Sequence, residues 1–304
     1  MSKKAFLFPG QGSQYVGMAK DLFDNSVEAK EMIKTADNAL GINLSYIMFN
    51  GPEDKLKQTE FTQPAIFLHS VVLASLIRTI TPQAAAGHSL GEYSALVTAN
   101  SIQFYEAIKL VRERGKAMQQ AGIDNPGTLA AIVGLDPKIV EDICKEASSE
   151  GIVQCANFNS PGQIVISGSI TGVRKAMEIC KSNGAKLVKE LVVSGAFHSP
   201  LMQSAKDKLL DALNKTNIYD ARFPVYANVT ANPVLEKEEI KNLLYEQVTS
   251  PVRWEETIVN MVNDGFEEFY EIGPGKVLQG LVKRINPDVK VFNLDKYADV
   301  ERYL

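Results

Sequence analysis

Residues 87–91 read Gly-His-Ser-Leu-Gly, which fits the pattern G-x-S-x-G of an exposed nucleophilic serine. A run of small residues predicted as a strand precedes this segment, and a helix predicted over 90–99 follows it. The glycines permit a tight turn that presents the Ser89 hydroxyl, while the backbone N–H of Leu90 and the helix N-terminus face a developing oxyanion. We therefore predict that Ser89 attacks a carbonyl carbon, and the pattern alone does not choose between hydrolysis and acyl transfer.

A serine hydroxyl is a poor nucleophile until a base takes its proton, and the chain contains three histidines. His69 lies in an apolar helix predicted over 63–80, where a core role is expected. His88 is adjacent to Ser89, so the backbone tends to direct the two side chains apart. His198 follows the last predicted strand of the central region, in a loop that can return to the serine. We predict His198 as the base, and a loop histidine without a catalytic role is the alternative.

Arg114 stands on the apolar face of a helix predicted over 105–118. The face is otherwise formed by Ala107, Val111 and Met118. Burial of a guanidinium is costly unless an anion accepts its hydrogen bonds, and the planar fork of arginine suits a carboxylate. The anion is either a substrate carboxylate or an internal residue such as Glu92, and the spacing leaves both open.

The elements that position these residues alternate between strands and helices. A short apolar strand over 4–8 ends in a Pro-Gly-Gln-Gly turn, and apolar residues recur at helical spacing over 21–40. The stretch from about 127 to 193 reads strand, helix, strand, strand, helix, strand. This βαββαβ order predicts a ferredoxin-like subdomain. A strand over 223–229, a helix over 252–264 and a strand over 267–272 then resume the α/β pattern.

The small subdomain is therefore predicted as an insertion in a larger α/β domain. We place its boundaries at residues 126–194, with the catalytic domain formed by residues 1–125 and 195–304. A chain of 304 residues with 45% hydrophobic and 22% charged residues is long enough for such a two-part globular structure.

Net charge and composition limit the classes of partner and cofactor that we expect for this protein. The net charge of −4 gives no basic excess for nucleic acid or an anionic membrane. No apolar run approaches the roughly 18 residues of a membrane span, and the short apolar run near the N-terminus leads us to expect no secretory signal. Three cysteines without C-x-x-C spacing indicate reduced, mostly buried thiols. We expect a cytoplasmic protein, a monomer because no coiled coil is indicated, and no metal or bound cofactor because no phosphate loop, dinucleotide fingerprint or ligand cluster is found.

Several segments together resemble those of the malonyl-CoA:acyl carrier protein transacylase family. The similarity runs in order from residue 4 to about residue 286, with family-like spacing. The matching segments are Phe8-Pro9-Gly10-Gln11-Gly12-Ser13-Gln14, Gly87-His88-Ser89-Leu90-Gly91-Glu92-Tyr93, Arg114-Gly115, Gly195-Ala196-Phe197-His198-Ser199, Gln247 with Pro251-Val252-Arg253-Trp254, and Glu271-Ile272-Gly273-Pro274-Gly275. The resemblance implies an α/β-hydrolase-like large domain that carries the ferredoxin-like subdomain, with the active site between them.

The resemblance also implies a role for each matching site residue. Ser89 would be the nucleophile, His198 the base, and Arg114 the partner of the malonyl carboxylate. The backbone amides of Gln11 and Leu90 would form the oxyanion hole.

Further roles follow from the same resemblance. Gln247 would orient His198 in place of the acid of a triad, and Asn157 and Asn159 match an Asn-Phe-Asn segment near the cleft. Phe197, directly before the histidine, is typical of the malonyl rather than the methylmalonyl type and leaves little room for an α-methyl group.

The implied function is ping-pong transfer of malonyl from malonyl-CoA to the phosphopantetheine thiol of a holo acyl carrier protein, through a malonyl-serine, in fatty acid biosynthesis. One alternative is a trans-acting malonyl acyltransferase of a polyketide synthase. From different classes, a serine hydrolase or thioesterase and a docking module without turnover are also considered. Hydrolases of this architecture usually carry an acid between serine and histidine, and no acid between Ser89 and His198 stands in such a context.

Overall fold

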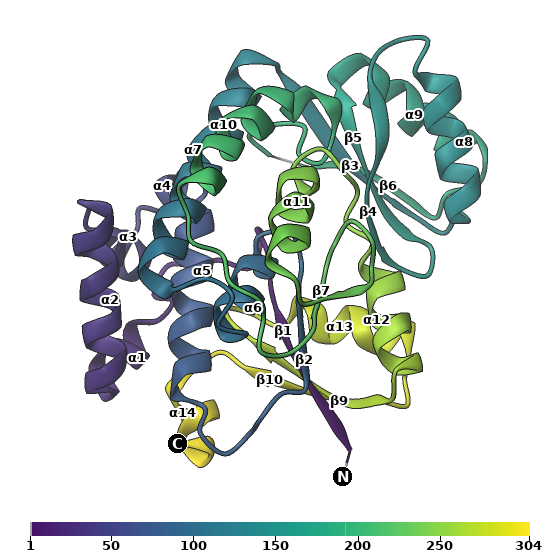
Figure 1. The fold of residues 1–304 in the computed structure, drawn as a ribbon. Helices are drawn as coiled ribbons and strands as arrows, with labels where there is room; N and C mark the ends of the chain where they lie inside the picture. Colours follow the sequence, from purple (N-terminus) through teal and green to yellow (C-terminus); the bar gives the residue numbers. More distant parts are fainter. Residues whose placement is uncertain (1, 192) are drawn as a thin grey trace.

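The computed structural model describes residues 2–191 and 193–304 and contains two β-sheets surrounded by helices (Figure 1). The larger sheet has the order β10-β9-β1-β2-β7-β8, in which β8 alone is antiparallel to its neighbour. Its strands are β1 (Lys3–Phe8), β2 (Ala84–Gly87), β7 (Val225–Tyr226), β8 (Pro233–Val234), β9 (Phe266–Ile272) and β10 (Lys290–Leu294). The chain thus has an α/β fold with a mainly parallel sheet.

The smaller sheet is antiparallel and has the order β4-β5-β3-β6. Its strands are β3 (Gly127–Val133), β4 (Val153–Ser160), β5 (Gln163–Ser169) and β6 (Leu187–Leu191), with α8 (Pro137–Ala147) and α9 (Ile170–Ser182) between them. Figure 1 shows α8 and α9 on the face of this sheet that points away from the rest of the chain. Cys144, Cys155 and Cys180 are free thiols buried in the core beneath the two helices.

The remaining helices cover the larger sheet or connect its strands. They are α1 (Lys20–Asn25), α2 (Val27–Leu40), α3 (Leu44–Asn50), α4 (Glu53–Leu56), α5 (Thr59–Leu76), α6 (Gly91–Thr98), α7 (Phe104–Asp124), η1 (Pro200–Met202), α10 (Gln203–Asn214), α11 (Lys237–Gln247), α12 (Trp254–Asn263), α13 (Val277–Ile285), α14 (Tyr297–Val300) and η2 (Glu301–Tyr303).

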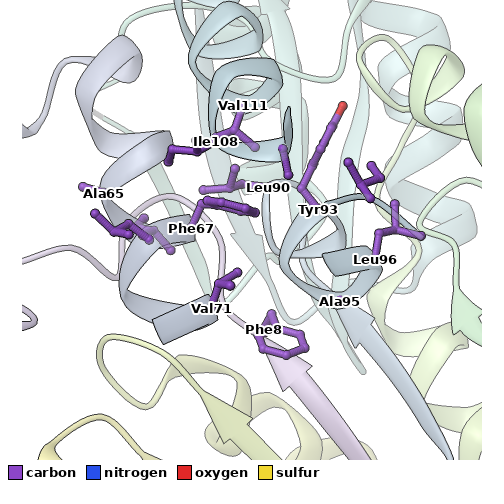
Figure 2. Close-up of a cluster of buried hydrophobic side chains, with 14 of the residues drawn as sticks. Phe8, Ala65, Phe67, Val71, Leu90, Tyr93, Ala95, Leu96, Ile108 and Val111 are labelled. Atoms are coloured by element: carbon purple, nitrogen blue, oxygen red, sulfur yellow. The ribbon is translucent and has the colours of Figure 1, made fainter. Parts of the chain in front are cut away.

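Strand β1 supplies side chains to two separate cores because successive residues of a strand face opposite sides of the sheet. Phe6 and Phe8 pack into the core formed with α5, α6 and α7, which Figure 2 shows around Phe8, Phe67 and Tyr93. Ala5 and Leu7 pack on the other side, into the core formed with α12 and α13. Both faces of the strand are buried, as expected for a parallel sheet covered by helices.

Two expected elements differ most from the structure. The helix predicted over 21–40 is two helices, because Ser26 is extended and its hydroxyl accepts a hydrogen bond from the Ala29 N–H, which begins α2 anew. The strand predicted over 223–229 shrinks to the two residues of β7. Pro224 has no N–H to give to the sheet, and Asn228 turns away to bond the segment around Ser89.

The small sheet is fastened to the larger unit by main-chain hydrogen bonds from β4. The Phe158 N–H donates to the Val252 oxygen at 2.9 Å, and the Val252 N–H donates to the Ala156 oxygen at 2.8 Å. The Gln154 side chain also donates to the main-chain oxygen of His198 at 2.8 Å. These contacts hold the small sheet over the C-terminal ends of β1 and β2, where the chemically important residues lie.

Candidate active site

Ser89 lies in a strained turn between β2 and α6. Its φ angle is +52°, in the left-handed region that non-glycine residues rarely adopt. The two flanking glycines are required by space, since a Cβ on Gly87 would lie 1.9 Å from the Gly91 carbonyl carbon. A Cβ on Gly91 would lie 2.0 Å from the Phe8 oxygen. The Gly-His-Ser-Leu-Gly segment therefore forms the tight strand-to-helix turn that its sequence predicts.

Asn228 holds this turn from the neighbouring segment after β7. Its side-chain oxygen accepts from the Ser89 N–H at 2.6 Å, and its side-chain nitrogen donates to the Gly87 oxygen at 2.6 Å. The sequence analysis missed Asn228. The available signal was a polar residue inside a segment with the pattern of a buried strand, and the residue is fully buried.

His198 contacts Ser89 through one ring nitrogen and the backbone through the other. Nε2 lies 2.8 Å from Ser89 Oγ, while Nδ1 lies 2.9 Å from the main-chain oxygen of Gln247 and 3.1 Å from that of Ser250. Because carbonyl oxygens only accept, Nδ1 carries the proton and Nε2 is free to accept the serine proton. Burial, with a smaller effect from the Arg114 charge, lowers the pKa of His198 to about 3.

Arg114 extends from α7 to the same serine. Nη2 donates to Ser89 Oγ at 3.1 Å and to Gln247 Oε1 at 2.8 Å, and Nη1 donates to Gln63 Oε1 at 2.7 Å. The residue is 1% exposed, and burial lowers the pKa of its guanidinium. Its described hydrogen-bond partners are neutral oxygens, so this cation is buried without a carboxylate in contact.

Glu92, the internal partner considered for Arg114, is separated from it by the Gln247 amide. Glu92 Oε2 accepts from Gln247 Nε2 at 2.9 Å and from the Asn228 N–H at 2.9 Å. The direct salt bridge is therefore not formed in the described part of the chain. Gln63 was also missed by the sequence analysis, although its side chain is a polar group at a buried position of an apolar helix.

A cavity of about 300 Å³ opens above Ser89, between the two sheets. Its lining includes the predicted site residues Gln11, Leu90, Asn157, Asn159, Phe197 and His198. Asn159 Oδ1 lies 2.9 Å from His88 Nε2, so this amide also fixes the histidine next to the serine. Leu129, Val165 and Leu191 of the small sheet and Leu281 of α13 give the cavity an apolar wall. An apolar wall beside a polar end suits a ligand with an apolar stretch and one charged or reactive end.

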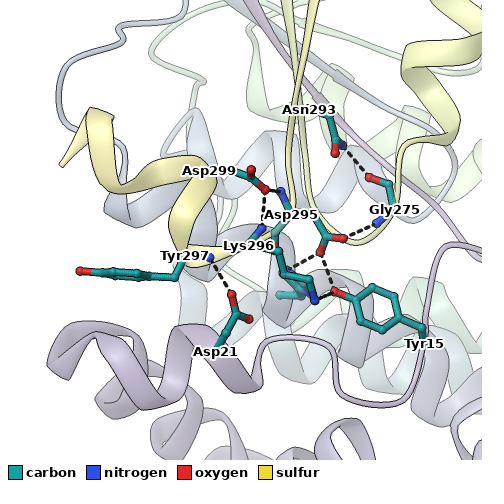
Figure 3. A network of polar contacts seen from close by, with 9 residues as sticks. Tyr15, Asp21, Gly275, Asn293, Asp295, Lys296, Tyr297 and Asp299 are labelled. Carbon is teal, nitrogen blue, oxygen red and sulfur yellow. Dashed lines mark hydrogen bonds and ion pairs between the residues drawn. The ribbon is translucent and has the colours of Figure 1, made fainter.

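A polar network links the loop after β1 to the segments that follow β9 and β10 (Figure 3). Tyr15 donates to Asp295 at 2.8 Å, and the other Asp295 oxygen accepts from the Gly275 N–H at 3.2 Å. His69 is fully buried beside this network, with Nε2 2.8 Å from the main-chain oxygen of Asp295. It is a core histidine, as predicted.

No helix in residues 2–191 and 193–304 is long and apolar enough to cross a membrane. No group of three or more His, Cys, Asp or Glu side chains there could hold a metal ion.

Known proteins that are similar to this chain in sequence and those that are similar in structure are of the same kind. Residues 5–293 match the family model described as acyl transferase domain. The chain is 45% identical to a malonyl CoA-acyl carrier protein transacylase of Bacillus subtilis, over 99% of this chain and 96% of the relative. It is equally similar to one from Staphylococcus aureus, with 99% and 98% coverage.

Solved structures agree with these relatives. A malonyl CoA-acyl carrier protein transacylase from Coxiella burnetii superposes with a TM-score of 0.95 at 39% identity, covering 99% of this chain and 96% of the other. A malonyl-transacylase solved in complex with a type II polyketide acyl carrier protein gives a TM-score of 0.95 at 40% identity, covering 100% and 99%.

Proposed function

This chain belongs to the acyl transferase family, within it to the malonyl CoA-acyl carrier protein transacylases, and from that premise we propose that Ser89, His198 and Arg114 carry out the malonyl transfer. One observation supports the proposal above the others. The Ser89 hydroxyl lies within hydrogen-bond distance of both a proton acceptor, His198 Nε2, and a cation, Arg114 Nη2. The proposed nucleophile lies beside a proton acceptor and a cation suited to a carboxylate, which supports these three roles.

In the first half-reaction Ser89 Oγ attacks the thioester carbon of malonyl-CoA while its proton moves to His198 Nε2. The tetrahedral intermediate collapses, the C–S bond breaks, and the CoA thiolate takes the proton from His198. The product is a malonyl-serine ester. In the second half-reaction the carrier-protein thiol gives its proton to His198 and attacks the ester, and Ser89 recovers the proton. Every proton and bond in these steps is accounted for by the thiols of CoA and the carrier protein and by side chains of this chain. The proposal therefore includes no cofactor.

His198 works in this scheme without a carboxylate partner. The main-chain oxygens of Gln247 and Ser250 keep the proton on Nδ1 and orient the ring. The low pKa of His198 leaves the base neutral and ready at neutral pH, and makes its protonated form a strong acid for the leaving thiolate.

The negatively charged oxygen of the tetrahedral intermediate must be stabilised by hydrogen-bond donors. We propose the backbone amides of Gln11 and Leu90, which line the cavity beside Ser89. The N-terminus of α6 adds its partial positive charge at the same place.

Arg114 is proposed to bind the malonyl carboxylate. Neutral amide oxygens of Gln63 and Gln247 hold the guanidinium in place and leave its charge for the substrate. Phe197 closes the cavity near the α-carbon, and Asn157 and Asn159 line its polar wall. Hydrogen bonds to charged groups contribute ~1.5–3 kcal/mol, or roughly one to two powers of ten in rate.

The finer description of the fold is also a proposal. We describe residues 1–125 and 195–304 as an α/β-hydrolase-like catalytic domain and residues 126–194 as a ferredoxin-like insertion. The strand order β4-β5-β3-β6 with two helices on one face supports the latter. A cytoplasmic location is proposed because three buried thiols are free, as is usual in a reducing compartment.

An intact-mass measurement tests the central proposal. The protein is mixed briefly with malonyl-CoA and then chased with holo acyl carrier protein, and Ser89→Ala is treated in the same way. We expect one malonyl group on the native protein, none on the variant, and transfer of the group to the carrier. Loss of the adduct to water at the same rate with and without carrier would instead favour a thioesterase.

The proposed acceptor is the carrier protein of fatty acid biosynthesis. A polyketide carrier protein is the second candidate, because the malonyl-transacylase bound to such a carrier is 40% identical over the whole chain. A chase with equal amounts of both holo carriers decides between them, since the preferred acceptor collects the malonyl group first.

A further inference from the structure

Glu92 is a buried carboxyl group that no step of the proposed mechanism uses. It lies in the first turn of α6, three residues after the nucleophile, and is 3% exposed. Its Oε2 atom accepts hydrogen bonds from Gln247 Nε2 and from the Asn228 N–H, each at 2.9 Å. An acid in such a place is costly when ionised, so its position behind the active site requires a reason.

The Gln247 amide links this acid to the substrate-binding arginine. Gln247 Nε2 donates to Glu92 and Gln247 Oε1 accepts from Arg114 Nη2 at 2.8 Å. A carboxylate only accepts and a guanidinium only donates, so the two ends together fix the orientation of the amide between them. Glu92 and Arg114 therefore form an ion pair with one neutral amide in the middle.

The charges of this cluster balance only while the site is empty. Arg114 is the charged side chain that acts on Glu92. Burial raises the pKa of Tyr93 to about 12, and burial lowers the pKa values of His88 and His198, so these three neighbours are neutral near pH 7. Arg114 and an ionised Glu92 sum to zero, and a malonyl carboxylate would bring the buried cluster to −1.

We propose, on the premise that Arg114 binds the malonyl carboxylate, that Glu92 is the counter-ion of Arg114 in the empty site and takes up one proton when malonyl arrives. The substrate carboxylate then replaces Glu92 as the anion that balances Arg114, and the buried cluster returns to zero charge. Glu92 is thereby a positioning and specificity residue, acting on the substrate through Gln247 and Arg114.

The proton affinity of Glu92 supports this exchange. Burial raises the pKa of the carboxyl from 4.5 to about 7, against the opposing effects of Asn228, Gln247 and Arg114. A second negative charge nearby raises the pKa further. Near neutral pH, malonyl binding therefore moves Glu92 from partly ionised to protonated.

Two consequences are measurable. The preference for malonyl over acetyl falls as the pH rises above about 7, because only the malonyl reaction requires the protonated acid. Forming the malonyl-serine also takes a proton from solution. The chemical step itself leaves the solution unchanged, because the serine proton ends on the CoA thiol, and thiols such as that of cysteine, with a pKa of ~8.5, are mostly protonated near neutral pH.

The first experiment compares kcat/KM for malonyl-CoA and acetyl-CoA between about pH 6 and about pH 8.5. Their ratio cancels titrations common to both reactions, including those of His198 and CoA. The native ratio is expected to fall by at most ~10-fold per pH unit, the limit for one proton. Glu92→Gln, which keeps an acceptor oxygen, should give a ratio that does not change with pH. A flat native ratio, or an unchanged slope in Glu92→Gln, would overturn the inference.

Glu271→Gln is the matched control. Glu271 is also a fully buried glutamate, and burial likewise raises its pKa to about 7, but it accepts from backbone N–H groups at the start of α13. This variant should keep the native slope. If it loses the slope as Glu92→Gln does, the effect belongs to buried carboxyl groups in general and the inference fails.

Proton uptake by the native protein provides a second test that needs no variant. A pH indicator in weak buffer near pH 7.5 should report uptake of up to about one proton per malonyl adduct and none per acetyl adduct. Equal signals for the two acyl groups would refute the inference. Failure of the proposed function has a different signature, because Arg114→Ala would then keep the native preference for malonyl.

Discussion

The imidazole of His198 is held by the main-chain oxygen of Gln247, which lies 2.9 Å from Nδ1. The Gln247 side chain lies instead between Arg114 and Glu92, and its Nε2 also donates to the main-chain oxygen of Ser89 at 3.1 Å. One residue therefore contacts the proposed base through its backbone and the proposed carboxylate-binding arginine through its side chain. The resemblance predicted only that Gln247 orients the histidine, and the contact that does so does not depend on the side chain.

Substitution of Gln247 by alanine should separate these two contributions. Gln247→Ala keeps the main-chain oxygen, so acetyl loading of Ser89 should change by less than about threefold. Malonyl loading should fall roughly 10-fold or more, because Arg114 loses a hydrogen bond of ~1.5–3 kcal/mol that positions it. Stopped-flow or quenched loading with each acyl-CoA measures both rates. An equal loss for malonyl and acetyl would mean that the side chain supports the nucleophile or the base, for example through its contact with the Ser89 main-chain oxygen.

Removal of the guanidinium tests the carboxylate site directly. Arg114→Ala should lower kcat/KM for malonyl-CoA by roughly 10- to 100-fold and leave that for acetyl-CoA unchanged or higher. The reason is that the cation interacts with a group that only malonyl carries. Competition between the two acyl-CoAs, read by intact mass, measures the change in preference.

Arg112 offers a matched control on the same helix. It is also largely buried, at 8% exposure, but it pairs with Glu60 at 3.0 Å, whereas Arg114 donates to Ser89 Oγ. Arg112→Ala should keep the native preference for malonyl. If Arg114→Ala instead lowered kcat/KM for malonyl-CoA and for acetyl-CoA by similar factors, that result would count against a role of Arg114 in binding the carboxylate.

Much of the site was predictable because its residue types are rare or its local pattern is strong. The glycines around Ser89 are forced by close backbone contacts, and three histidines left few candidates for the base. The positions that sequence reasoning missed make contacts that only the folded chain creates. Asn228 lies 139 residues from Ser89, and Gln63 lies 51 residues from Arg114. No local periodicity encodes such pairs.

For the fold, too, elements with a strong local pattern were predicted, and elements that depend on distant contacts were not. The strands and helices between residues 127 and 191 obey their own periodicity and were predicted within a few residues. The prediction was wrong for residues 223–229, because Asn228 leaves the sheet to bond the Ser89 turn and thereby ends β7 early. Strand β10 was missed because it is a short edge strand in a tail without a motif.

The pH dependence of acyl loading should reflect the lowered pKa of His198. The base must be neutral, and burial brings its pKa to about 3, so the acid limb should lie far below the usual value of ~6.5. Acetyl-CoA is the substrate of choice, since its reaction is independent of a carboxylate. In Arg114→Ala the acid limb should move to higher pH, because a nearby positive charge is gone. A limb near pH 6.5 in the native protein would contradict this account.

Asn228 should contribute strongly to stability as well as to activity. Asn228→Ala removes both hydrogen bonds to the Ser89 turn and leaves the buried Ser89 N–H and Gly87 oxygen without these partners. Each unsatisfied group costs ~1–3 kcal/mol. Chemical denaturation should show a loss of about that size or more. Asn232→Ala is the control, because Asn232 is an exposed residue at the nearby turn, and its loss should be below about 0.5 kcal/mol.

The buried glutamates should make the fold less stable as the pH rises. Burial raises the pKa of Glu92 and of Glu271 from 4.5 to about 7, so between these values the folded state holds more protons than the unfolded state. The free energy of unfolding therefore decreases through that window and levels off above it. The loss is at most about 3.5 kcal/mol for each carboxyl group, because the pKa shift is about 2.5 units at ~1.4 kcal/mol per unit.

Glutamine variants of the two residues test whether the free energy of unfolding decreases with pH for this reason. Glu92→Gln cannot ionise, so relative to the native protein its stability should improve on going from about pH 5 to about pH 8. Thermal unfolding at the two pH values gives the difference, in which any pH-independent cost of the substitution cancels. Glu271→Gln should show the same sign, because burial acts on that carboxyl in the same way. A native protein whose stability rises from pH 5 to pH 8, with both variants following in parallel, would mean that these carboxyl groups are ionised in the fold at both pH values.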